Sequence, residues 1–77
     1  MRRQLVGEAL CRTSPVRYFL LEDGESYGVG ISLEGEAADV PGLSPSRTRV
    51  WELREALVRG AVTPVALRDV VDDWLLE

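Results

Sequence analysis

Apolar and polar residues alternate along the first half of the chain and follow a helical period along the second half. The alternation is clearest in residues 16–33, and the period changes near Gly42, where Pro and Gly interrupt the pattern. After Gly42, apolar residues recur three and four positions apart. The pattern predicts one α+β domain over residues 1–77, in which an antiparallel β-meander of three to four strands precedes two helices packed on one sheet face.

Residues 16–33 predict a β-hairpin. Asp23-Gly24 is a preferred centre for a two-residue type I′ turn, and pairing outward from it sets Phe19 opposite Gly28. The face toward the core then carries Val16, Tyr18, Leu20, Tyr27, Val29, Ile31 and Leu33. The other face carries Phe19, Gly28 and Gly30. These glycines either accommodate strand twist beneath Phe19 or leave a flat surface for a ligand or partner.

One further strand is predicted on each side of the hairpin. Residues 5–12 form the first, whose register is ambiguous because Leu5 and Val6 compete for the inner face. The favoured register turns Leu5, Ala9 and Cys11 inward. Residues 37–40 predict a short edge strand that ends at Pro41-Gly42, since proline cannot donate a ladder hydrogen bond.

The first helix is expected to begin after Ser44-Pro45-Ser46 and to end at Arg59, with Gly60 in the left-handed conformation. Its inward stripe is Val50, Leu53 and Leu57. A second stripe, Trp51, Arg54 and Val58, lies about 100° around the helix. Either the last helix covers this stripe as core or the stripe is exposed, in which case a Trp beside an Arg has the composition of a binding hot spot.

The last helix is expected to be capped by Thr63, with Pro64 at its first position. Its core stripe is Leu67, Val70, Val71, Trp74 and Leu75. Its outer face carries Asp69, Asp72 and Asp73, followed by Glu77, although the helix dipole disfavours negative charge near a C-terminus. A straight helix face cannot wrap a cation, so two interpretations remain: a solvated face, or a surface that recognises a basic partner.

Residues 69–75, Asp-Val-Val-Asp-Asp-Trp-Leu, preceded by 63–67, Thr-Pro-Val-Ala-Leu, resemble a family of small uncharacterised bacterial proteins, a domain of unknown function found chiefly in Clostridia-like Firmicutes. That family joins a Tyr-Gly strand, here Tyr27-Gly28, to a Val-x-x-Leu helix and a closing Pro-x-x-Leu-x-Asp-Val-Val-(Asp/Glu)-Asp-aromatic-Leu segment. This chain has Ala66 where the family tends to carry a polar residue. The resemblance implies the architecture and brings no activity, cofactor or substrate.

Composition narrows the function classes. The formal net charge is −4 and the sequence pI is near 4.7, which disfavours a partner bound through phosphate groups. All nine cations are Arg, a bias that we attribute to a GC-rich coding sequence. The chain has no His, and its single Cys11 has no base to activate it, so we expect no enzyme, no metal and no cofactor. The apolar run after Met1-Arg2-Arg3 is too short for a signal peptide or a membrane span, so we expect a cytoplasmic protein without membrane contact.

These patterns favour a non-enzymatic adaptor or regulator that binds another protein. The candidate partner-binding residues are Trp51, Arg54, Val58, Asp69, Asp72 and Asp73. A self-associating, homodimeric structural protein is the alternative, with an edge strand or the Phe19-Gly28-Gly30 face as its contact. Nucleic-acid binding through the Arg side chains of the first helix, Arg47, Arg49, Arg54 and Arg59, is a remote third possibility.

Overall fold

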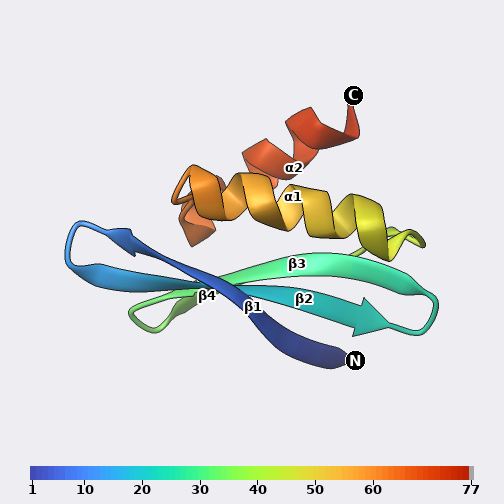
Figure 1. The fold of residues 1–77 in the computed structure, drawn as a ribbon, viewed down its shortest axis with the longest axis horizontal. Coiled ribbons are helices and arrows are strands. Elements are labelled where there is room, and N and C mark those ends of the chain that lie inside the picture. The colour runs from blue at the N-terminus through green and yellow to red at the C-terminus, as the bar shows by residue number, and fades with distance from the viewer. Residues whose placement is uncertain (77) are drawn as a thin grey trace.

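Four antiparallel strands form one sheet in the order β1-β2-β3-β4, and two helices lie on one of its faces (Figure 1). The computed structural model describes residues 1–76, and Glu77 of the acidic helix end lies outside them. The elements are β1 (Arg2–Cys11), β2 (Ser14–Asp23), β3 (Ser26–Leu33), β4 (Glu36–Ser44), α1 (Arg47–Arg59), the 3₁₀ turn η1 (Pro64–Ala66) and α2 (Leu67–Leu75). This arrangement confirms the predicted α+β meander.

The core lies between the sheet and α1, as the alternation predicted. The fully buried side chains of this cluster are Val16, Tyr18, Leu20, Val29, Ile31, Val50, Leu53, Leu57, Leu67 and Val71, whereas Tyr27 and Leu33 are half-buried. The Tyr18 hydroxyl donates to the carbonyl oxygen of Val62 at 2.8 Å, which ties β2 to the segment after α1. Burial raises the pKa of Tyr18 above its ordinary value, and the nearby charge of Cys11 adds to the shift.

The hairpin has the expected faces but not the expected register. Asp23 pairs with Ser26 around a Gly24-Glu25 loop, so Phe19 lies opposite Gly30 rather than Gly28. Gly24 has a positive φ of 64°, whereas Asp23 does not, and a type I′ turn centred on Asp23-Gly24 would need a positive φ at both. Because the shift is two residues, every side chain stays on its predicted face.

A β-bulge in β1 resolves the ambiguity of the first strand, and it makes the Leu5 assignment wrong. Leu5 pairs with Phe19 and Gly7 with Tyr18, so Val6 is the extra residue between them. Val6 packs against the core, as Ala9 and Cys11 do, whereas Leu5 is 51% exposed on the opposite face. An extra residue reverses the alternation at that point, which no strictly two-residue pattern can predict.

The fourth strand is longer than predicted, because β4 continues through Pro41-Gly42 to Ser44. The ladder with β3 is irregular between Tyr27 and Val29, and a proline is tolerated in an edge strand at such a point. A Cβ atom at Gly28 would collide with the backbone of Val40 and Pro41. This glycine therefore lets β4 cross closely over β3.

The boundaries of α1 are as predicted, but its C-terminal cap differs. Ser46 accepts a hydrogen bond from the backbone N–H of Arg49 at 3.3 Å. Gly60 has a φ of −86°, and Ala61, with a φ of 48°, is the left-handed residue. The N–H groups of Ala61 and Val62 donate to the carbonyls of Val58 and Leu57, each at 3.1 Å. This is a Schellman motif that begins one residue later than expected.

The last helix has a narrower buried stripe than predicted. It begins at Leu67 rather than at Pro64, which is buried in the preceding turn η1. The expected side-chain cap is also absent, because the Thr63 side chain makes no cap hydrogen bond. Leu67 and Val71 are buried, and Val70 and Trp74 are half-buried. Leu75, assigned to the core from its spacing, is 54% exposed. The reason is that α2 rises away from the sheet toward its C-terminal end (Figure 1).

Candidate partner-binding surfaces

The second stripe of α1 packs on β1. Arg54 donates from Nη1 to the carbonyl oxygen of Val6 at 3.1 Å, so it satisfies a backbone acceptor at the β-bulge. Val58 lies directly over Gly7, where an added Cβ atom would come within 2.7 Å of its Cγ2 methyl group. Val6 and Gly7 were not singled out from the sequence, although glycine inside a strand often marks a close approach.

Trp51 is half-buried, and two guanidinium groups flank it. The Cζ atom of Arg54 lies 4.3 Å from the ring centroid, and that of Arg47 lies 4.9 Å from it. Both distances suit a cation–π contact. The sequence offered two outcomes for this stripe, cover by the last helix or full exposure. The structure shows a third, because β1 covers Arg54 and Val58 while Trp51 stays partly open.

Arg54 also carries the one side-chain nitrogen in residues 1–76 that is buried without a hydrogen-bond partner, its Nε atom. The guanidinium is thus held by a single carbonyl and by the face of Trp51. Such a group belongs to the packing of α1 against β1 and has little freedom to reach a partner.

The acidic face of α2 points into solvent. Asp69, Asp72 and Asp73 are all exposed, and so is Arg68 beside them. Within residues 1–76, the ion pairs join other side chains: Arg3 with Asp39, and Arg59 with Glu55. The carboxylates of α2 therefore have no ion-pair partner in the part of the chain that the structure describes.

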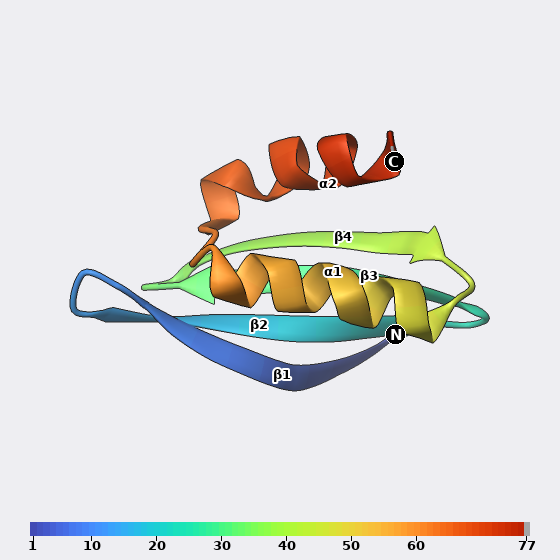
Figure 2. The same cartoon turned by 45° about the horizontal axis from the view of Figure 1, so that its top comes forward.

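An aromatic contact holds the C-terminal end of α2 to α1. The Cζ atom of Arg49 lies 4.8 Å from the ring centroid of Trp74. Figure 2 shows α2 on the β4 side of α1, whereas β1 lies on the other side. The candidate residues therefore form two separate surfaces: Trp51, Arg54 and Val58 over β1, and Asp69, Asp72 and Asp73 on α2.

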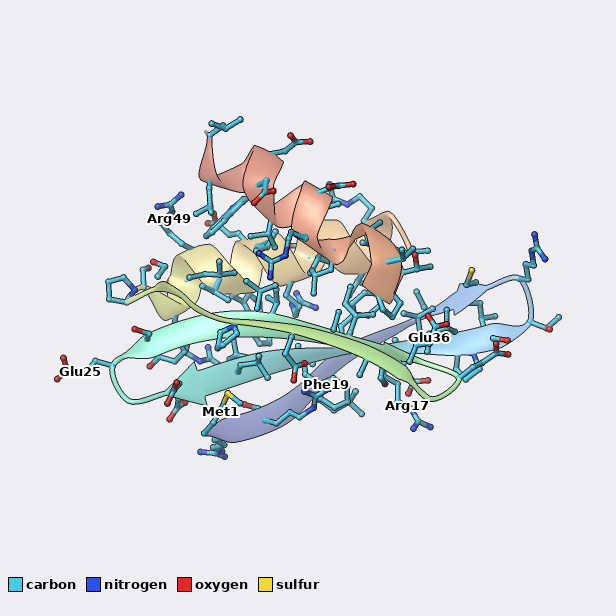
Figure 3. All side chains as sticks on the ribbon, turned by 180° about the vertical axis from the view of Figure 1, so that it is seen from behind. Met1, Arg17, Phe19, Glu25, Glu36 and Arg49 are labelled. Atoms are coloured by element: carbon cyan, nitrogen blue, oxygen red, sulfur yellow. The ribbon has the colours of Figure 1, made fainter. Side chains whose placement is uncertain are left out.

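The sheet face away from the helices is uncovered (Figure 3). On it, Arg3 reaches from β1 across the Phe19 ring, with Cζ 4.1 Å from the centroid, to Asp39 of β4, where Nη1 and Oδ1 are 2.6 Å apart. A Cβ atom at Gly30 would collide with this Asp39 carboxylate. Hence one glycine of the predicted flat surface carries an ion pair of the chain itself.

Leu21 lies on the same uncovered face and is fully buried, which the sequence did not predict. In the ladder it lies between Arg3 and Gly28, and Pro41 comes over Gly28. The chain's own side chains and its edge strand thus cover one end of the face.

Other chemistry is sparse in the described residues. An open hollow at the β1–β2 turn is lined by Cys11, Arg12, Thr13, Ser14, Leu33 and Glu34, and the Ser14 hydroxyl donates to the Glu34 carboxylate there. Residues 1–76 hold no group of three His, Cys, Asp or Glu side chains placed to share a metal ion. Over the same residues, neither helix is long and apolar enough to cross a membrane.

Comparison with known proteins gives one family. The model of a family described as a family of unknown function, DUF6514, matches residues 5–77. No curated protein and no solved structure matches the chain.

Proposed function

The chain belongs to the family of unknown function DUF6514, and from its surface chemistry we propose that it is a non-enzymatic protein that binds another protein through the outer face of α2. It acts as a small adaptor or regulator in a bacterial cytoplasm. The proposal rests on α2 rather than on the Trp51 stripe, because β1 engages Arg54 and Val58.

The observation that carries this proposal is the unpaired charge on α2. Asp69, Asp72 and Asp73 are exposed, and the ion pairs within residues 1–76 use other groups. Negative charge in the last turns of a helix opposes the helix dipole and repels its neighbours. Asp69 lies in the first turn of α2, where the dipole favours negative charge, whereas Asp72 and Asp73 lie in the last turns and disfavour the helix slightly. Cations from a partner would reverse that cost.

The partner is expected to be basic with an apolar centre. Leu75 is 54% exposed and Leu76 is 86% exposed beside the acidic face, so the surface offers apolar area as well as charge. Apolar contact supplies affinity, while opposite charge speeds association and sets orientation. A basic helix or strand with one or two large apolar side chains fits both.

The four Arg residues of α1 make nucleic acid a weaker candidate. Arg54 binds the Val6 carbonyl and Arg59 pairs with Glu55. Arg47 stacks on Trp51 and Arg49 stacks on Trp74. Binding phosphate groups through these side chains would require them to leave existing contacts, on a chain whose net charge is −4.

The test compares two charge variants of the immobilised protein in a native lysate. The first removes the α2 charges by Asp69→Asn, Asp72→Asn and Asp73→Asn. The matched control removes the same number of exposed charges elsewhere, by Asp23→Asn, Glu25→Gln and Glu36→Gln. Quantitative mass spectrometry should find a basic protein retained by the unmodified chain and by the control, and lost from the α2 variant. Equal retention by both variants would refute the proposal.

A further inference from the structure

We propose that the uncovered face of the sheet is the contact between two copies of this chain in a two-fold symmetric dimer. Both helices lie on the other face, so no helix covers the outward side chains of the four strands (Figure 3), although Leu21 among them is buried by the chain itself. The face is named here the open face. Its middle row is Leu5, Phe19, Gly30 and Asp39.

The open face is more apolar than an outer sheet face normally is. Antiparallel sheets with one face in water usually alternate apolar residues inward with polar residues outward. Here Leu5 is 51% exposed and Leu10, which pairs with Pro15, is 67% exposed. Phe19 is half-buried, and the Arg3 guanidinium lies over its ring. A second copy would remove these groups from water.

The charges of the open face favour a second copy over a basic partner. They are Arg3, Glu8, Arg17, Asp23 and Asp39, two cations and three anions, and Arg3 already pairs with Asp39. The face therefore carries a charge of −1, whereas the whole chain carries a net charge of −4. Two copies repel one another less through this face than through the rest of their surface, and a basic partner gains little attraction from it.

The size of the open face fits a weak dimer. The molecule extends 35 × 26 × 17 Å, and the strands run along the longest axis while the two layers stack along the middle one (Figure 1). These extents bound the sheet face at 35 by 17 Å, or at most about 600 Å² per copy, so a dimer would bury at most about 1,200 Å², the lower limit for specific interfaces. We expect a dissociation constant in the micromolar range.

The sheet edges are poorer contacts than its face. β1 is interrupted by the bulge at Val6, whose carbonyl accepts from Arg54, and β4 carries Pro41 at its own irregularity. Bulges and prolines at edges prevent strand addition. Two open faces packed together would instead form a sandwich with helices on both outer sides.

Sedimentation velocity over a concentration series tests the dimer. The unmodified chain should shift from monomer mass toward twice that mass between about 5 and 500 µM. Leu5→Glu should remain monomeric over the whole series, with an unchanged circular dichroism spectrum. Leu76→Glu, the same change at an 86% exposed position just after α2, should dimerise like the unmodified chain.

A monomer at every concentration, or equal dimerisation of Leu5→Glu and the unmodified chain, would overturn the proposal. If Leu5→Glu fails to fold, Leu10→Glu tests the same face from a more exposed position. A monomeric chain would leave the α2 proposal intact, because that proposal concerns a different face of the molecule.

Discussion

The orientation of α2 can be tested with one pair of valine substitutions. Val71 is 2% exposed in the core, and its burial fixes which side of α2 carries Asp69, Asp72 and Asp73 outward. Val71→Ala removes two buried methyl groups, each contributing about 0.8 kcal/mol, and leaves a small cavity. We expect a loss of about 2 kcal/mol in the free energy of unfolding, which lowers Tm by about 8 to 16 °C for a domain of this size.

Val65→Ala is the matched control, since it removes the same atoms from a side chain that is 87% exposed on η1. It should change the free energy of unfolding by less than about 0.5 kcal/mol. Urea denaturation followed by far-ultraviolet circular dichroism measures both variants. If Val71→Ala is as stable as the unmodified chain, the helix is rotated or undocked, and the assignment of its acidic side as the outer face is wrong.

Three further predictions concern other contacts. Gly7→Ala should destabilise the chain by about 1 to 3 kcal/mol, because its Cβ would lie 2.7 Å from the Val58 Cγ2 methyl. Thermal melts of the double variant should show that adding Val58→Ala relieves most of this cost. Ala61→Gly should raise Tm, since relief of the left-handed φ of 48° stabilises by about 0.5 to 1 kcal/mol, whereas Gly60→Ala should be tolerated. The raised pKa of Tyr18 means that the folded chain keeps a proton that the unfolded chain loses near pH 10.0, so the free energy of unfolding should fall as pH rises above that value. Tyr18→Phe should be less stable by about 1 kcal/mol at neutral pH, because it loses the hydrogen bond to Val62. In urea titrations it should also lose part of the decline in stability at alkaline pH.

The parts of the fold that were predictable from sequence are those with a long periodic signal. The alternation in β2 and β3 placed Tyr18 and Ile31 on the core face, and the helical spacing placed Val50 and Leu57 inward. The ends of α1, at the N-cap Ser46 and at Arg59, were also predictable, because a cap residue and a glycine flank the periodic run. The hairpin register was wrong by two residues, and yet the faces were right, because parity decides the face.

The parts that were missed depend on local backbone geometry that side-chain periodicity does not report. The bulge at Val6 shifts the register of the β1–β2 ladder, and the β3–β4 ladder is irregular where β4 passes through Pro41. The left-handed position fell on Ala61 rather than on the adjacent glycine, and residue spacing alone does not fix at which residue a helix closes. Exposure of Leu75 depends on the tilt of α2, which the spacing within a helix cannot give.

The candidate surfaces were predicted unevenly for the same reason. The outer position of Asp69, Asp72 and Asp73 follows from the phase of one helix, and the structure has these side chains exposed. The environment of Trp51, Arg54 and Val58 depends on which element lies beside α1. The Val6 carbonyl at the bulge accepts from Arg54, and the missing side chain of Gly7 leaves room for Val58.

The central claim, that α2 is the recognition surface, is tested most directly by hydrogen–deuterium exchange of the complex with the captured partner. α2 is held by few buried side chains, so its amides should exchange quickly in the free chain. The account predicts that partner binding slows exchange in peptides covering residues 67–75 and leaves the β2 and β3 peptides unchanged. Unchanged exchange in α2, with new protection in the strands or in α1, would contradict it.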